Sequence, residues 1–100
     1  MELRQYMVEF RLPEVLNEEF TDLIPEQRAK INALMDAGVV LCYTLNSERT
    51  KLWTVIVANS EQAVMDLLSQ MPLISFMKPT IHELTFHNQS SLVMPSISLN

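Results

Sequence analysis

The sequence predicts one α+β domain whose elements follow the order β-α-β-β-α-β. Two kinds of pattern support this prediction. Short segments alternate between apolar and polar residues or are rich in β-branched residues, and longer segments carry apolar residues at every third or fourth position. The chain has 100 residues, of which 48% are hydrophobic and 19% charged. A chain of this length has room for a single core.

The first predicted strand covers residues 2–12. Its alternate positions carry Tyr6, Val8, Phe10 and Leu12 on one side and Gln5, Met7, Glu9 and Arg11 on the other. One dry face is therefore expected. Pro13 ends the strand, because a residue without an amide hydrogen cannot continue a ladder in the middle of a sheet.

A long helix is predicted next, because apolar residues from Phe20 to Met35 keep a spacing of three and four. Asn17 is a suitable N-terminal cap. Pro25 removes one helical hydrogen bond and crowds the carbonyl four residues back, so we expect either a kink there or a true start near Asp22. Gly38 supplies the left-handed residue that ends the helix.

The second half of the chain predicts a hairpin, a short helix and a last strand. The expected elements are strands over residues 39–45 and 52–58 with a polar turn at 46–50, a helix capped by Asn59 or Ser60 that ends before Pro72, and a strand over residues 80–87. Right-handed crossovers then place both helices on one face of a four-stranded antiparallel sheet, the ferredoxin-like arrangement. We expect this domain to cover residues 1–88. The apolar tail, residues 89–100, is expected to pack on its own or a neighbouring subunit.

Composition argues against several classes of function. The net charge is −5, and no basic run is present to neutralise a nucleic acid backbone. The only cysteine, Cys42, forms no internal disulfide and has no second ligand at metal-binding spacing, which favours a reducing cytoplasm. Charges at Glu2, Arg4 and Glu9 interrupt the N-terminal segment, so we expect neither a signal peptide nor a membrane span.

The helix-free face of the predicted sheet needs a partner. It bears residues such as Leu3, Met7, Cys42 and Thr44, and would expose a sizeable apolar area if left alone. Two such sheets facing each other form a barrel with cavities between them, and small-molecule sites favour such concave, mostly apolar places. We therefore expect a homodimer, or a larger homo-oligomer, with a small ligand between its subunits.

The segment LLSQMPLISFMKPTIHEL, residues 67–84, resembles the muconolactone isomerases of the dimeric α/β-barrel superfamily. The pattern L-L-S-x-x-P-L-x-x-x-M after a short capped helix, and a final strand ending in His87, carry the likeness. A first strand closing in Leu12-Pro13 and a helix ending at Gly38 agree with it. The resemblance runs from about residue 2 to about residue 88.

This resemblance implies a cofactor-free isomerase that moves a proton within an unsaturated lactone, in a site between subunits. Such a step needs a base near one carbon and donors around the carboxylate and lactone oxygens. In the family, strand one carries a His and a Glu on the cleft face, and strand two an Arg-His pair. The matching positions here hold Gln5 and Met7, and Leu41 and Cys42, so the resemblance implies a divergent site.

Two residues are the candidate proton carriers. Glu9 shares the strand face of Met7 and could act as the base of a shifted site; the alternative is a solvated acid, or one paired with Arg11. His82 is the second candidate, against a hydrogen-bonded structural histidine. Both His82 and His87 are expected on the last strand, on opposite faces because their numbers differ by an odd count.

The candidate substrate-binding residues are Gln5, Met7, Arg11, Cys42, Thr44 and Trp53. Arg4, Arg11 and Arg28 are the possible anion clamps, and Arg11 is preferred because it shares the cleft face. Trp53 could stack on a planar ligand or fill a core, and Cys42 is a small buried hydrophobe unless a base activates it. Two functions stay open: an isomerase-like enzyme acting on a carboxylated ring compound, and a non-catalytic protein that binds a small ligand or assembles.

Overall fold

The computed structural model describes residues 2–90, with strands and helices in the predicted order. In chain order the elements are β1 (Arg4–Arg11), α1 (Glu18–Asp36), β2 (Val40–Leu45), β3 (Lys51–Ala58), α2 (Glu61–Leu68), the 3-10 turn η1 (Ile74–Phe76) and β4 (Lys78–Glu83). The predicted element order β-α-β-β-α-β is confirmed.

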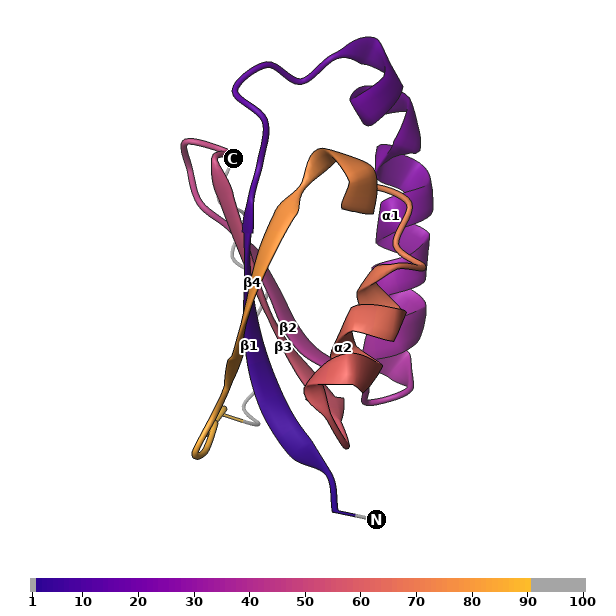
Figure 1. Ribbon diagram of the computed structural model, residues 1–100. Coiled ribbons are helices and arrows are strands. Elements are labelled where there is room, and N and C mark those ends of the chain that lie inside the picture. The colour runs from indigo at the N-terminus through magenta and orange to yellow at the C-terminus, as the bar shows by residue number, and fades with distance from the viewer. Residues whose placement is uncertain (1, 91–100) are drawn as a thin grey trace.

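Antiparallel pairing joins the strands in the order β2-β3-β1-β4. Both α-helices lie on one side of the sheet, to the right of it in Figure 1. The opposite side carries no helix of the described residues, and we call it the open face. The ferredoxin-like α+β fold is therefore as predicted, with β2 and β4 as the two sheet edges.

The hydrophobic core fills the space between the sheet and the helices, and β1 supplies its centre. Tyr6, Val8 and Phe10 are each at most 1% exposed. Burying side chains of this kind contributes about 1.5–3 kcal/mol each. Phe20 of α1 packs edge-on against Phe76 of η1, with ring centroids 5.6 Å apart. The dry side of the predicted first strand is thus the side that faces the helices.

Helix α1 begins at Glu18, so the expected alternative start near Asp22 is wrong. The Asn17 side chain accepts a hydrogen bond from the backbone amide of Phe20 at 2.8 Å and caps the first turn. With the start fixed by this cap, Pro25 lies inside the helix and costs it one backbone hydrogen bond.

The C-terminus of α1 is closed by a Schellman motif around Gly38. The amide of Val39 donates to the carbonyl of Leu34 at 2.9 Å, and that of Gly38 to Met35 at 3.0 Å. Gly38 has a φ of 76°, in the left-handed region that glycine adopts without penalty. The predicted stop at Gly38 is confirmed.

Replacing Gly38 by Ala is expected to lower the free energy of unfolding by about 1 kcal/mol, because a Cβ disfavours the left-handed conformation even where space is free. Urea unfolding of the two proteins measures the difference. Gly38→Asn is the matched control and should lose less, since Asn tolerates this conformation better. An alanine variant as stable as the wild type would contradict the assignment.

Other boundaries differ from those predicted. Helix α2 is capped by Ser60, whose Oγ accepts from the amide of Ala63 at 3.1 Å, and it ends at Leu68. Strand β4 begins at Lys78 because an edge strand tolerates Pro79, and it ends at Glu83 rather than at residue 87. His87 therefore lies beyond the strand, so the predicted placement of both histidines on one strand, with opposite faces, is wrong.

Candidate functional site

The eight predicted catalytic and preferred substrate-binding residues share the open face. Directly paired residues of antiparallel strands point to the same side, and the register together with the alternation along each strand places all eight residues on that side. The set comprises Gln5, Met7, Glu9 and Arg11 of β1, Cys42 and Thr44 of β2, Trp53 of β3 and His82 of β4.

The first transverse row crosses the middle of this face and is mostly apolar. Val55 of β3 pairs with both Cys42 and Met7, and Met7 pairs on its other side with His82. Val55 is fully buried although it lies outside the core under the helices. His82 is exposed at the edge of the row. A planar apolar group could lie along this row with an imidazole at one end.

The second row holds an anchored carboxylate. Trp53 donates its indole N–H to Glu9 Oε1 at 2.9 Å, and Lys51 Nζ lies 3.9 Å from Glu9 Oε2. The expected alternative partner of Glu9 was Arg11; the partners are instead Trp53, its direct cross-strand neighbour, and Lys51. Thr44 and Thr80 complete the row at its two ends. Glu9 is therefore held in place, and one of its oxygens is already occupied.

The third row consists of cations. Arg11 pairs directly with Lys51 on one side and with Lys78 on the other. Like charges placed opposite each other destabilise a sheet, so this row favours an anion beside it. Within residues 2–90, Arg11 and Lys78 form no ion pair. The sequence analysis missed Lys51 and Lys78, which only the strand register aligns with Arg11.

The opposite end of the open face is crossed by the chain that follows β4. Leu84 donates its amide to the Gln5 carbonyl at 2.8 Å, and the amide of His87 donates to Gln5 Oε1 at 3.1 Å. Gln89 then reaches β2, donating from Nε2 to the Leu41 carbonyl at 3.2 Å. The Gln5 side-chain oxygen is thus already engaged. The rest of the predicted tail, residues 91–100, lies outside the described residues.

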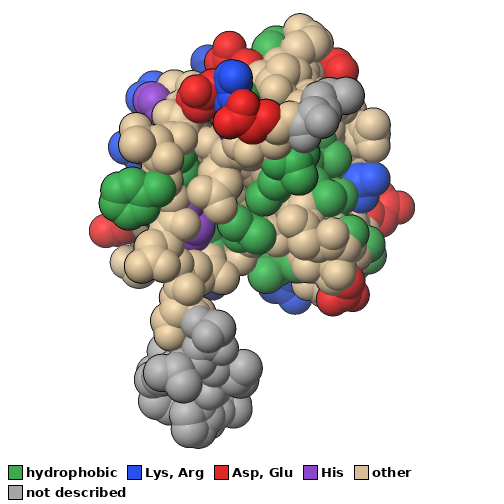
Figure 2. Space-filling model, turned by 90° about the horizontal axis from the view of Figure 1, so that it is seen from below, with side chains coloured by type: hydrophobic (Ala, Val, Ile, Leu, Met, Phe, Trp, Pro, Cys, Tyr) green, Lys and Arg blue, Asp and Glu red, His purple; other side chains and the backbone are tan. Residues whose placement is uncertain are grey.

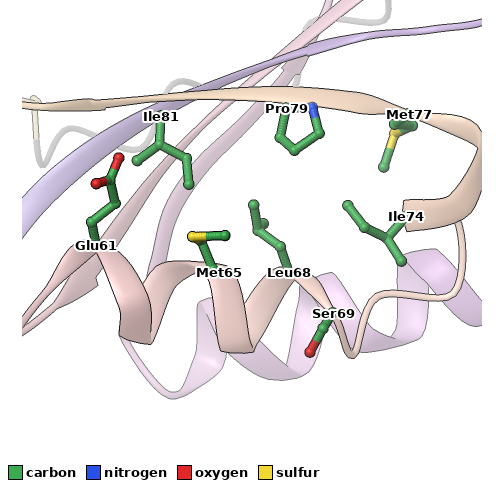
Figure 3. A pocket seen from close by; sticks show the side chains of 8 residues that line it. All are labelled: Glu61, Met65, Leu68, Ser69, Ile74, Met77, Pro79 and Ile81. Atoms are coloured by element: carbon green, nitrogen blue, oxygen red, sulfur yellow. The ribbon is translucent and has the colours of Figure 1, made fainter.

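Two hollows lie on the helix side of the sheet. The first, of about 400 Å³, is a groove between α2 and β4, into which Met65 and Leu68 point from the helix and Pro79 and Ile81 from the strand (Figure 3). Met65 is 52% exposed. Seen from below, hydrophobic side chains form patches bordered by charged ones (Figure 2). None of the predicted site residues lines this groove.

The second hollow, of about 330 Å³, lies between α1, the β2–β3 hairpin and the residues that flank η1, Leu73 and Met77, and we call it the α1 cavity. Its polar interior is a network around Gln27, which is 2% exposed. Gln27 Nε2 donates to the Tyr43 hydroxyl at 3.1 Å, and Gln27 Oε1 accepts from the amide of Leu73, also at 3.1 Å. Burial raises the pKa of Tyr43, and the hydrogen bond from Gln27 opposes that rise. Arg28, one of the possible anion clamps, lines this cavity, whereas none of the predicted catalytic and preferred substrate-binding residues does.

Within residues 2–90, no group of three or more His, Cys, Asp or Glu side chains is arranged to hold a metal ion. In the same part of the chain, no helix combines the length and the apolar character that crossing a membrane requires.

A comparison with known protein families shows which family the chain belongs to. The model of the muconolactone delta-isomerase family matches residues 5–90. The chain belongs to the muconolactone delta-isomerase family. No curated protein matches it closely.

The family fold is also present in a solved structure, the crystal structure of muconolactone isomerase at 3.3 Å resolution. It superposes with a TM-score of 0.68 at 20% sequence identity, over 92% of this chain and 99% of the other. At this identity the likeness concerns the fold. For this member of the muconolactone delta-isomerase family, the matched range includes all three rows of the open face and the segment that crosses its end.

Proposed function

We propose that this protein catalyses a proton transfer within a small carboxylated lactone or ring compound bound on the open face, and that it needs no cofactor. Membership of the muconolactone delta-isomerase family supports this class of reaction. The observation that carries the proposal is the arrangement of the open face. A row of cations lies beside an anchored carboxylate, and an imidazole lies on the neighbouring strand.

In this proposal Arg11 and Lys78 bind the carboxylate of the substrate, since a guanidinium matches the planar geometry of a carboxylate. His82 carries the proton, because the two ring nitrogens of an imidazole can accept and donate protons. Glu9 is a diagonal cross-strand neighbour of His82, since Glu9 pairs with Thr80 and His82 with Met7. Diagonal neighbours lie about 7–8 Å apart, so Glu9 is close enough to stabilise a positively charged imidazole.

A second candidate function is non-catalytic binding of a small ligand. Two observations favour it: Glu9 already accepts the Trp53 indole N–H, and Gln5 already accepts the amide of His87. Both polar groups are thereby committed to contacts within the chain. The apolar middle row would then bind the ligand without performing chemistry on it.

We also propose that a second copy of the chain covers the open face and that the protein acts in the cytoplasm. The apolar middle row supports the first part, because a sheet face of this kind is stabilised by burial. The free thiol of Cys42 supports the second, since reducing compartments keep thiols unpaired.

Solvent-deuterium exchange distinguishes the two functions. The protein is mixed with a muconolactone-type substrate in D₂O, and deuterium at carbon is followed by NMR. An isomerase incorporates deuterium, or shifts the double bond, faster than buffer alone does. A protein that binds the substrate without either change would be a ligand-binding member of the family.

Arg11→Gln is expected to weaken binding of the carboxylated substrate about tenfold, because it removes a charge-assisted hydrogen bond. The expected result is a higher KM in the exchange assay with a smaller effect on kcat. Arg4→Gln is the matched control: Arg4 belongs to the same strand, but it forms an ion pair with Glu83 at 3.3 Å and lies off the open face. Equal losses in the two variants would argue against an anchor at Arg11.

A further inference from the structure

The α1 cavity has the features of a ligand site that is separate from the open face. Its walls come from α1, the segment that precedes it, the β2–β3 hairpin and the two residues that flank η1. The lining is mostly apolar, and its volume of about 330 Å³ falls at the lower end of the range for small-molecule pockets. The apolar lining residues are Leu12, Leu16, Phe20, Ile24, Leu45, Leu52, Leu73 and Met77. Such a cavity accepts one small apolar body.

The charged residues that line this cavity are Arg28 of α1 and Arg49 of the hairpin turn, and no acid joins them. Both arginines are exposed, and neither forms an ion pair within residues 2–90. In a chain of net charge −5, two arginines at one cavity without a carboxylate are a local positive site. An anionic head group therefore fits the rim.

The position of Arg49 is fixed by the turn that carries it. Arg49 has a φ of 60°, a conformation that costs a non-glycine residue free energy. The turn is held by Asn46, whose Oδ1 accepts from the amides of Thr50 at 2.9 Å and Lys51 at 3.0 Å. The hairpin thus presents Arg49 at the cavity from a defined backbone position.

Inside the cavity the Tyr43 hydroxyl offers one further donor. The hydroxyl oxygen accepts a hydrogen bond from Gln27 Nε2. The hydroxyl hydrogen is donated to no partner within residues 2–90. A half-buried hydroxyl with an uncommitted hydrogen gains from an acceptor, and a carboxylate oxygen forms a strong, charge-assisted hydrogen bond with such a donor.

We propose that the α1 cavity binds a small carboxylic acid with an apolar body, of the size of an aromatic ring, with its carboxylate at Arg28, Arg49 and Tyr43. The apolar body contacts the side chains of Phe20, Ile24 and Met77. The proposal is independent of the function proposed for the open face, because the two sites share no residue.

Benzoate is the probe, and benzamide is its uncharged counterpart of nearly the same shape. Titration of the ¹⁵N-labelled protein is expected to give saturable shifts at the amides of Leu73, Arg28 and Arg49, with benzamide binding about tenfold or more weakly. Shifts confined to open-face amides such as Met7 and His82, equal affinity for both probes, or no saturation would each overturn the proposal.

Variants separate this cavity from the open face. The double variant Arg28→Gln/Arg49→Gln changes exposed side chains only, and it should weaken benzoate binding about tenfold or more while leaving benzamide binding unchanged. Tyr43→Phe should weaken benzoate binding by a smaller factor. Arg4→Gln is the matched control and should leave the benzoate affinity unchanged, since Arg4 pairs with Glu83 and does not line the cavity. If Arg11→Gln abolishes benzoate binding and the cavity double variant does not, the carboxylate binds at the open face and the proposal fails.

Discussion

His82→Gln is expected to slow deuterium exchange into a muconolactone-type substrate by about 10²–10⁴-fold, the usual contribution of a positioned general acid or base. The chain has two histidines, and His82 is the one that the strand register aligns with the open-face rows. Glutamine keeps the polarity and approximate size of the side chain but cannot carry a proton in the same way. The loss should therefore appear in kcat, with the affinity for the substrate nearly unchanged.

His87→Gln is the matched control for this variant. His87 lies beyond β4, where its ring Nε2 is 3.1 Å from Gln89 Oε1. Its replacement should leave the exchange rate within about a factor of ten of the wild type, since the residue lies in the segment that crosses the end of the face rather than in one of its rows. Equal exchange rates in wild type and His82→Gln would remove His82 from the mechanism.

Gln27→Leu is expected to lower the free energy of unfolding by about 1–3 kcal/mol, although it places an apolar residue in an apolar surrounding. Leucine cannot accept the hydrogen bond from the amide of Leu73, a residue that is 5% exposed. This donor is then left buried without a partner, and the Tyr43 hydroxyl loses its amide donor as well. The cost comes from desolvation rather than from lost packing.

Urea unfolding followed by Trp53 fluorescence measures this loss. Gln62→Leu is the matched control, because Gln62 lies exposed on α2, where its side chain donates a hydrogen bond to Asp66 at 3.0 Å. A surface change of this kind usually stays within about 0.5 kcal/mol. Should the two leucine variants be equally stable, the network around Gln27 would contribute nothing to the folded state.

The sequence could predict the faces of the fold because side-chain parity in a strand is local information. Alternation over β1 separates Tyr6, Val8 and Phe10 from Met7 and Glu9, and the structure puts the first group in the core and the second on the open face. Caps at Asn17 and Ser60 and the glycine stop at Gly38 are equally local signals. The family resemblance rests on these structural motifs, which explains why fold and family could be predicted together.

The contents of each row could not be predicted, because they depend on register between strands that are distant in sequence. No local pattern indicates that Lys51 and Lys78 lie beside Arg11. Nor does one indicate that Glu9 bonds to the Trp53 indole and not to Arg11. The end of β4 was missed for a related reason. Residues 84–87 have the alternating composition of a strand, but the chain leaves the ladder after Leu84 donates to Gln5.

The α1 cavity was also missed, because its lining comes from separate elements and most of it has the pattern of core. The apolar stripe of α1 predicts that its side chains are buried, and this prediction is confirmed for Phe20 and Ile31. A polar residue at helical core spacing, Gln27, is the signal that could have drawn attention to this region. Its two partners, Tyr43 and Leu73, are known only once the fold brings them together.

Deuterium exchange in two double variants tests most directly whether the chemistry belongs to the open face. Arg11→Gln/His82→Gln removes the proposed anchor and proton carrier from that face, while Arg28→Gln/Arg49→Gln removes the cations of the α1 cavity. The proposed function predicts that the first variant loses substrate exchange while still folding, and that the second keeps the wild-type rate. Exchange that survives in the first variant and disappears in the second would contradict it and move the reaction to the helix side of the sheet.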